Sequence, residues 1–365
     1  MRDFRSYARA EACLGDGLTV LHGPNGAGKS NLLEALYYGC TGHALRARNE
    51  RELVRFGERT TRVVVHTDDG RERHELSVGY GLFAEDERPV KHMRADGAPV
   101  ERLLDVEARP LVSVFLPDRL ELIKGTPALR RAHLDALVGG LWPTRSSTRR
   151  AYSRALTQRN ALLASIRAGR ASRETLPSWD QELAVHAIAL REDRAAAVGR
   201  VAAPFAERTE QLGLQGAATL EYRPRSGAQS PEEFVQELRE RLAGELQRGF
   251  STHGPHRDEL VFLREGRELR TYGSQGEQRL ALLALLLAER AVLAQERSHT
   301  PLMLLDDVMS ELDSQRRELL AQELTSAGQS VIATTDLAHV PASGDHHTMR
   351  LRISPGAVLR EALAA

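Results

Sequence analysis

The sequence predicts an α/β protein in which a parallel sheet is interrupted by a long, mainly helical insert. Two short aliphatic runs indicate the sheet: residues 18–22, which lead into a glycine-rich turn, and residues 302–305, which end in two aspartates. Between residues 120 and 247, apolar side chains recur at spacings of three and four, the period of amphipathic helices.

The first aliphatic run leads into a glycine-rich loop made of Gly23, Pro24, Asn25, Gly26, Ala27, Gly28, Lys29 and Ser30. This is the pattern G-x-x-x-x-G-K-[S/T] between a strand and a helix, which binds nucleotide phosphates through backbone N–H groups at a helix N-terminus. We expect Lys29 to sit over the β and γ phosphates and Ser30 to give its hydroxyl to Mg²⁺. The alternative is a glycine turn that only caps an ordinary helix.

Lysine usage supports the phosphate interpretation. The chain has only three lysines, at positions 29, 91 and 124, and uses arginine elsewhere. Because a lysine ammonium is a compact point charge, its retention at position 29 favours a contact with phosphate.

Composition is that of a globular protein without a dominant charge. The chain has 365 residues, 41% of them hydrophobic, and a formal net charge of zero, so any anion-binding surface must be local. Cys13 and Cys40 are too few for a disulfide framework and are typical of a reducing compartment. The longest apolar run, 280–288, is too short to cross a bilayer. We therefore expect a cytoplasmic protein.

Residues 60–115 read as a β-rich segment. Residues 61–67 and 75–80 are predicted to pair as strands, and residues 112–115 form another strand candidate. Turn residues at 68–70 and 96–97 separate these runs.

Helical patterning dominates from about residue 118 to 247, with a break at 169–177. We interpret this segment as a helical hairpin inserted between two halves of one domain. The predicted division is an α/β domain made of residues 1–118 and 248–365, with a helical arm over 119–247.

The helical segment is locally basic. Ten arginines and a single acid, Asp135, lie between Arg130 and Arg173. Such a surface is expected where a protein grips a phosphate backbone, with Arg149, Arg150 and Arg154 as candidate DNA contacts. The alternative is a set of solvated helices in an arginine-biased sequence, and few aromatics accompany the run to stack on bases.

His253 and His256 stand three apart in the run Ser251–Asp258. A metal site is disfavoured because a Gly-Pro pair separates them and a third ligand is missing nearby. A structural turn or a phosphate contact is the favoured interpretation.

Further motifs follow in order. Residues 273–279, with Ser274 and Gly276, form a small-residue loop before the apolar helix that starts at Leu280. The run 301–307 is an aliphatic strand ending in acids, which predicts that Asp306 holds Mg²⁺ and Asp307 orients or deprotonates the attacking water. The alternative for this run is a strand end followed by an acidic helix cap.

Residues 310–313 and 331–336 complete the set. The first is a short turn that ends at Asp313, and the second is a last core strand ending in polar residues. A sensor of the γ-phosphate is expected at the end of that strand.

This ordered set, with a helical insert between its halves, resembles the ATPase heads of the ABC and SMC superfamily. Residues 4–7 are similar to the adenine-side opening strand of these heads, 274–277 to their signature motif and 310–313 to their D-loop. The chain more specifically resembles the RecF family of bacterial gap-repair proteins. The matching residues are 31–35, 116–118, 122–127, 130–131, 158–163, 251–258, 274–279 and 304–313.

The resemblance implies an ABC/SMC-type head and an ATP-dependent homodimer. Two ATP molecules would each lie between the glycine-rich loop of one subunit and Ser274 of the other, with Arg5, Asn31 and Gly276 as further nucleotide contacts. Slow hydrolysis would release the dimer. The family binds double-stranded DNA and double/single-strand junctions, and works with RecR and RecO to load RecA.

Some residues depart from the pattern of the superfamily. The inter-lobe glutamine has no counterpart between Ser30 and Gln158, and Asp118 is a weak substitute. Thr335 replaces a switch histidine and Asp307 replaces a longer glutamate, which indicates slow turnover. The short lead before Phe4 suggests a start codon further upstream.

Two other functions stay open at this point. A transporter ATPase subunit is disfavoured because the insert is long and basic. A small-molecule P-loop kinase is disfavoured because Ser274 and Asp313 would have no task in it.

Overall fold

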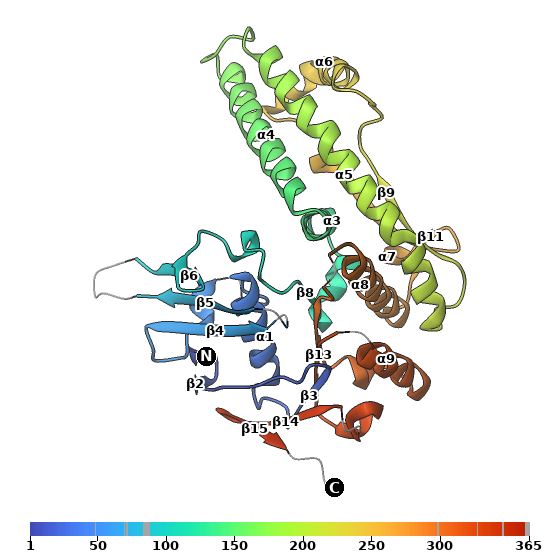
Figure 1. Ribbon diagram of the computed structural model, residues 1–365. Helices are drawn as coiled ribbons and strands as arrows, with labels where there is room; N and C mark the ends of the chain where they lie inside the picture. Colours follow the sequence, from blue (N-terminus) through green and yellow to red (C-terminus); the bar gives the residue numbers. More distant parts are fainter. Residues whose placement is uncertain are drawn as a thin grey trace. The chain divides into compact units, whose positions relative to one another are not determined.

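A computed structural model describes residues 1–47, 49–68, 70, 72–82, 88–297, 299–326, 328–344 and 347–361 (Figure 1). The chain forms two compact units: unit 1 comprises Met1–Arg119 and Ser298–Ala365, and unit 2 comprises Leu120–Arg297. Unit 2 starts at Leu120, one residue after the predicted start of the arm at residue 119. Its end differs from the prediction, because residues 248–297, which the sequence assigned to the α/β domain, pack within unit 2.

Unit 1 contains the parallel sheet that the aliphatic runs predict. Its six strands lie in the order β15-β14-β3-β13-β12-β8. All neighbouring pairs are parallel except β14 and the edge strand β15. The strands are β3 (Leu18–His22), β8 (Val112–Phe115), β12 (Leu302–Asp306), β13 (Ser330–Thr334), β14 (Met349–Ser354) and β15 (Ala357–Glu361).

A second six-stranded sheet of unit 1 has the order β2-β1-β4-β5-β6-β7 and is antiparallel. The predicted pairing of 61–67 with 75–80 is confirmed by β4 and β5, whereas the run 112–115 joins the parallel sheet instead. The strands are β1 (Arg2–Phe4), β2 (Tyr7–Arg9), β4 (Thr60–Asp68), β5 (Arg73–Gly81), β6 (Val90–Ala95) and β7 (Ala98–Pro99).

Helix α1 (Lys29–Thr41) follows the glycine-rich loop and packs against strands of both sheets. Its Leu32 and Leu33 belong to the core of the parallel sheet, while Ala35 and Tyr38 belong to the core of the antiparallel sheet. A Cβ atom on Gly39 would lie 2.4 Å from Cγ2 of Val65, so this glycine permits the close approach of helix and sheet. The start of α1 is therefore fixed by packing on two faces.

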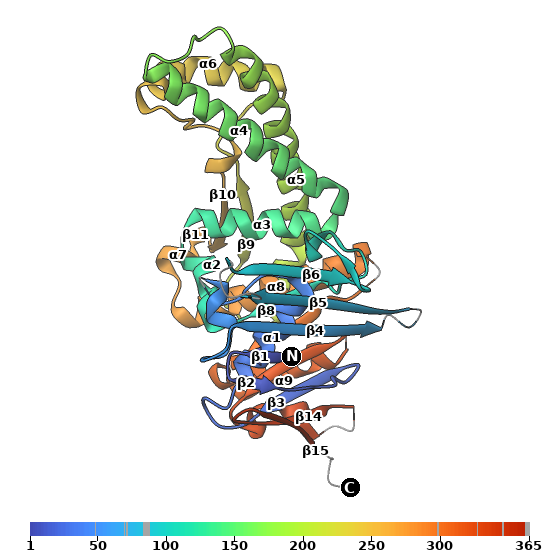
Figure 2. The ribbon, with the colours of Figure 1, turned by 90° about the vertical axis from the view of Figure 1, so that its left-hand side faces the viewer.

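Unit 2 is mainly helical (Figure 2). The predicted hairpin corresponds to α4 and α5, which are joined by residues 168–175 and share an apolar core with α6. The helices of unit 2 are α2 (Glu121–Lys124), α3 (Pro127–Leu141), α4 (Ser146–Arg167), α5 (Leu176–Gln211), α6 (Pro231–Arg248), α7 (Leu269–Tyr272) and α8 (Gln275–Arg297). The described part of unit 1 has one further α-helix besides α1, namely α9 (Ser314–Ser326).

The sequence analysis missed a three-stranded antiparallel sheet in unit 2. It consists of β9 (Ala218–Arg223), β10 (Glu259–Arg264) and β11 (Arg267–Glu268), in the order β11-β10-β9. In β9 the apolar residues Ala218, Leu220 and Tyr222 alternate with exposed polar ones, which is the period of a strand. Pairing of β10 with β9 and packing of α8 on α5 hold residues 248–297 in unit 2.

Candidate nucleotide-binding site

The glycine-rich loop lies between β3 and α1, as the sequence predicts. Gly23 has a φ of 155° and Gly28 a φ of 113°, conformations that side chains rarely adopt. A Cβ atom on Gly23 would lie 2.2 Å from the carbonyl oxygen of Ile353, and one on Gly28 would lie 2.8 Å from the hydroxyl of Tyr7. Tyr7 in turn donates a 3.1 Å hydrogen bond to the Gly28 carbonyl. The loop is thus held close to its neighbours on both sides.

The tip of the loop is open to solvent, whereas its end is buried. Pro24, Asn25 and Gly26 are exposed, and Ala27 is buried with its N–H donating to the Pro24 carbonyl at 3.2 Å. The N-terminus of α1 follows at once, without an acidic residue in its first turn. Free N–H groups and the positive end of the helix dipole make such a terminus favourable for an anion.

Lys29 is the first residue of α1, and its ammonium folds back over the loop. Nζ donates hydrogen bonds to the carbonyl oxygens of Gly23 at 2.7 Å and Pro24 at 3.0 Å. Burial lowers the pKa of Lys29, while the charges of Asp306 and Asp307 act in the opposite direction. The cation is therefore positioned beside two acids from a different part of the chain.

Ser30 and Asp306 meet at the end of β12. Asp306 is buried, and burial raises the pKa of its carboxyl against a hydrogen bond from the Ser30 side chain. The charges of Arg46 and Lys29 also favour the ionised carboxylate. A hydroxyl and a carboxylate oxygen are ligands that Mg²⁺ prefers, so this pair fits a magnesium ion.

Asp307 has an unusual backbone and an unpaired buried oxygen. Its φ of 51° lies in the left-handed region, and its N–H donates a 3.0 Å hydrogen bond to the carbonyl of Ala333 in β13. Among the described residues, Oδ1 of Asp307 is buried and finds no hydrogen-bond partner. Strained backbone and unsatisfied polar atoms of this kind concentrate at functional sites.

The opening strands contribute a buried ion cluster that the sequence analysis missed. Glu34 of α1 is fully buried and receives two hydrogen bonds from the Arg5 guanidinium, at 2.9 and 3.1 Å. The Arg46 guanidinium contacts the same carboxylate at 3.1 Å and also the Asn31 side chain at 3.1 Å. Asn31 donates to Ser6 Oγ at 2.9 Å. Arg5 and Asn31, predicted nucleotide contacts, are thus tied to Glu34 and Arg46.

Glu34 lies in the run 31–35 that carries the family resemblance, but no pattern in the sequence pairs it with Arg46. The spacing 34 to 46 matches no helical or strand period, since a turn separates the two residues. Only the fold brings Arg46 close enough for its charge to favour the ionised form of Asp306.

Ser274 and Gly276 lie in unit 2, at the N-terminus of α8. The Ser274 backbone N–H donates to the Glu277 carboxylate at 2.8 Å, and the Ser274 hydroxyl accepts from the Glu277 N–H at 3.3 Å. This reciprocal arrangement is a capping box. Ser274 and Gly276 are both exposed, so the predicted signature loop presents its hydroxyl and backbone at the surface.

The two remaining sequence motifs of unit 1 also lie at ends of the parallel strands. Ser310 and Asp313 are exposed, and the Asp313 carboxylate accepts a 2.9 Å hydrogen bond from the Arg316 N–H in the first turn of α9. Thr335 is exposed directly after β13. The side chain of Asp118, the suggested substitute for the inter-lobe glutamine, lies outside the described part of the structure.

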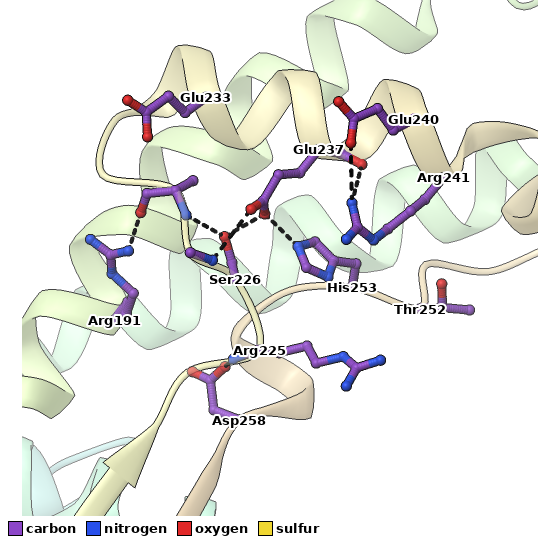
Figure 3. Close-up of polar contacts among 12 residues, drawn as sticks. Arg191, Arg225, Ser226, Glu233, Glu237, Glu240, Arg241, Thr252, His253 and Asp258 are labelled. Atoms are coloured by element: carbon purple, nitrogen blue, oxygen red, sulfur yellow. Dashed lines mark hydrogen bonds and ion pairs between the residues drawn. The ribbon is translucent and has the colours of Figure 1, made fainter.

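Side chains of the loop Ser251–Asp258 form polar contacts with other segments of unit 2 (Figure 3). Glu237 lies between His253 and Ser226 and hydrogen-bonds both at 2.5 Å. Burial would raise the pKa of Glu237, but the hydrogen bonds from Ser226 and His253 outweigh it and lower the pKa. His256 instead contacts Tyr152 and the Ser251 carbonyl. The two histidines thus face different partners, and the described residues contain no cluster of three or more His, Cys, Asp or Glu side chains that could hold a metal ion.

The basic segment 130–173 is less cationic at the surface than its sequence suggests. Three of its arginines form ion pairs with acids from other segments: Arg130 with Glu259, Arg145 with Asp193, and Arg159 with both Asp180 and Glu245. Arg149 pairs with Asp135, the one acid of the segment itself. The local basic surface predicted from composition is therefore reduced at Arg130, Arg145 and Arg159, because local composition does not count acids supplied by the fold. Arg149, Arg150 and Arg154 are all exposed on α4.

A helix long and apolar enough to span a membrane was not found among the described residues.

The sequence of this chain is similar to those of known proteins. The family model described as the RecF/RecN/SMC N terminal domain matches residues 1–349. A protein of Heliobacterium modesticaldum named DNA replication and repair protein RecF is 35% identical over 344 residues, which span 92% of this chain and 91% of that protein. A protein of the same name from Kineococcus radiotolerans is 34% identical over 387 residues, covering 98% and 97% of the two chains.

Solved structures agree with the fold. A structure titled as the recombination mediator protein RecF with ATP in the RecFOR pathway superposes with a TM-score of 0.86 at 26% identity, covering 99% of this chain and 96% of that one. An Smc head domain from Pyrococcus furiosus superposes with a TM-score of 0.56 at 17% identity, covering 99% and 95%. The predicted fold class, an ATPase head of the ABC and SMC type, is confirmed.

Proposed function

The chain belongs to the RecF family of the ABC and SMC superfamily of ATPases, and from this premise we propose that it is an ATP-dependent DNA-binding switch in replication and repair. The observation that carries the proposal is the meeting of Lys29, Ser30 and Asp306 at the mouth of the glycine-rich loop. A cation, a hydroxyl and a carboxylate from segments far apart in sequence converge where a triphosphate and its metal would bind.

Each residue has a proposed role in ATP hydrolysis. The N–H groups of the glycine-rich loop bind the phosphates, and Lys29 exchanges its carbonyl partners for phosphate oxygens. Ser30 and Asp306 would hold Mg²⁺, which neutralises charge on the phosphates when bound. Asp307 orients the attacking water through the carboxylate oxygen that has no protein partner among the described residues. Its short side chain supports slow turnover.

We propose that the chain forms a dimer, because its signature loop is exposed and can contact a second copy. The Ser274 hydroxyl and the N-terminus of α8 lie at the surface, which suits a contact with the γ-phosphate of an ATP bound to a second copy. Two copies would then enclose two ATP molecules. Hydrolysis removes the γ-phosphate contact and shifts the population to monomer.

The proposed partners are inferred from the names of the related proteins. A solved relative is titled as a recombination mediator of the RecFOR pathway, and the curated relatives carry the name of a DNA replication and repair protein. We propose that this chain binds double-stranded DNA and its junctions with single strands, and that it acts with RecR and RecO in loading RecA. The exposed Arg149, Arg150 and Arg154 are the proposed phosphate contacts.

The decisive experiment measures molecular mass by sedimentation with and without a slowly hydrolysed ATP analogue. The proposal expects a monomer without nucleotide and a dimer with the analogue. Ser274→Arg should still bind the analogue but remain monomeric, because the large cation obstructs the interface and not the glycine-rich loop. A monomer under saturating analogue, or a dimer of the Ser274→Arg variant, would contradict the sandwich.

A further inference from the structure

Unit 2 contains a series of buried ion pairs that extends from the exposed arginines of α4 to helix α8. Its centre is α3, which packs against α4, α5 and α8. Both ribbon views draw α3 next to α8 (Figures 1 and 2). All residues of the series belong to unit 2, so their distances are defined within one compact body.

Asp135 of α3 is shared by two arginines of different exposure. Its carboxylate lies 2.9 Å from Nε of Arg149 on α4 and accepts a 2.8 Å hydrogen bond from Nε of Arg194 on α5. The Asp135 side chain is 8% exposed and Arg194 4%, whereas Arg149 is 57% exposed. One buried anion is thus balanced by one buried cation and one cation that solvent reaches.

Arg194 is anchored independently of Asp135. Its Nη1 donates to the Pro255 carbonyl at 2.7 Å and contacts the Asp258 carboxylate at 3.3 Å. Arg149 is the partner of Asp135 that an external anion reaches, because its guanidinium stands at the surface. A phosphate would therefore compete with Asp135 for Arg149 and leave Asp135 with Arg194 alone.

The same helix also holds α8. His133 lies two residues before Asp135, and its Nε2 is 2.7 Å from Oε1 of Glu289 in α8. Both side chains are nearly buried, at 12% and 8% exposure. Because α8 is a continuous helix whose first residue follows Ser274, a shift of Glu289 moves the N-terminus that carries the signature loop.

We propose that α3 couples phosphate binding at α4 to the position of α8, with Asp135 as the residue that loses a partner and His133–Glu289 as the link. This inference rests on the proposed function, since it assumes DNA at α4 and a role for Ser274 in hydrolysis. When a phosphate takes Arg149, the remaining attraction between Asp135 and Arg194 draws α3 toward α5. The buried pair at His133 then carries that displacement to α8.

The test compares Glu289→Gln with the matched variant Glu296→Gln in the full-length protein. Glu296 also belongs to α8 and pairs with Arg200 of α5 at 2.5 Å, but that pair is more exposed. ATP binding is measured with a fluorescent ATP analogue, duplex binding by anisotropy at fixed salt, and the ATPase rate with and without duplex. Asp135→Asn, which keeps the size and the acceptor oxygen, is the second test variant.

The expected result is that both test variants bind ATP as the wild type does but show at least about fivefold less stimulation of the ATPase rate by duplex. Glu289→Gln should also bind duplex as the wild type does, whereas Asp135→Asn should bind duplex at least as tightly, because its neutral side chain competes less with phosphate for Arg149. Glu296→Gln should respond as the wild type does. Fluorescence of the two tryptophans, Trp142 and Trp179, which both lie in unit 2, verifies that each variant is folded.

Three outcomes would overturn the coupling. If both test variants keep the wild-type stimulation of the ATPase rate by duplex, α3 does not couple DNA binding to hydrolysis. If Glu296→Gln loses as much stimulation as the test variants, any ion pair on α8 has the same effect. A folded wild-type chain that hydrolyses ATP without any response to duplex would overturn the proposed switch as well. The first two results leave the proposed function standing, so the failures are distinguishable.

Discussion

The Tyr152 hydroxyl lies 2.7 Å from Nδ1 of His256 in the interior of unit 2, within hydrogen-bond distance. The other ring nitrogen, Nε2, lies 3.1 Å from the Ser251 carbonyl, which can only accept. The proton is therefore assigned to Nε2, and the imidazole is neutral. Burial lowers the pKa of His256 to about 4, which agrees with this assignment.

The first prediction concerns acid stability. Because the pKa of His256 is about 4 in the folded chain and about 6.5 in the unfolded chain, the unfolded chain binds more protons between these values. Stability of unit 2 should fall as the pH drops from about 6.5 to about 4, by at most about 3 kcal/mol from this group. Urea unfolding followed by tryptophan fluorescence measures it, since both tryptophans, Trp142 and Trp179, lie in unit 2.

The control for this prediction is His256→Asn, which removes the titrating group. Its stability at neutral pH should be lower because the hydrogen bonds of the ring are lost. Its dependence on pH between 6.5 and 4 should be flatter than that of the wild type. An equal slope in the two proteins would assign the acid sensitivity to other groups.

A second prediction concerns the buried charge of the arm. Arg159 is fully buried and holds Asp180 and Glu245 at 2.6 Å each. Arg159→Met should destabilise unit 2 by roughly 3–5 kcal/mol, because it leaves two buried carboxylates without their cation. Urea unfolding at neutral pH is the measurement. Arg154→Met, on the exposed face of the same helix, should change stability by less than about 0.5 kcal/mol.

A third prediction concerns Lys29. Lys29→Met should abolish nucleotide binding, because the cation that would meet the phosphates is replaced by a neutral thioether. Titration with a fluorescent ATP analogue measures the change. Lys124→Met removes an exposed lysine of unit 2 and should bind the analogue normally. Dimerisation of Lys29→Met with ATP would contradict the assignment of the site.

A fourth prediction concerns Asp307. Asp307→Asn should bind ATP, hydrolyse it poorly and accumulate as a dimer, because asparagine cannot activate the water as a carboxylate does. Asparagine also tolerates the left-handed backbone at a φ of 51°, so the fold is retained. Sedimentation that finds only monomer under ATP would count against the proposed role.

A fifth prediction concerns DNA. Changing Arg149, Arg150 and Arg154 together to glutamate should weaken duplex binding at fixed salt. The slope of log affinity against log salt concentration should also become shallower, by the amount expected for the loss of up to about three phosphate contacts. Arg239→Glu on α6 serves as a control, since Arg239 is exposed outside the proposed surface. Unchanged affinity of the triple variant would make this face of α4 an ordinary solvated surface.

Local sequence was sufficient to predict the candidate nucleotide site. The glycine-rich loop depends on neighbouring residues, because glycine conformations, the following helix and the preceding strand are all encoded within a short window. The same reasoning predicted the position of Asp306 and Asp307 at the end of β12, because the carboxyl ends of parallel strands lie at one edge of the sheet. The pairing of 61–67 with 75–80 followed from alternation and a turn.

Residues that act through distant partners could not be placed in this way. Nothing in the sequence indicates that Arg46 would lie near Asp306, or that Arg159 would be fully buried rather than part of a cationic surface. The sequence also left residues 248–297 with the α/β domain, although strand pairing and helix packing hold them in unit 2.

The sequence by itself determined the fold class and the position of the glycine-rich loop between a strand and a helix, because these depend on short-range backbone chemistry and on the periodicity of apolar residues. Only the tertiary structure decided which charges are neutralised, which arginines remain at the surface and which helix connects Arg149 to α8. Those properties depend on acids and cations that are far apart along the chain, and burial makes their pairing obligatory.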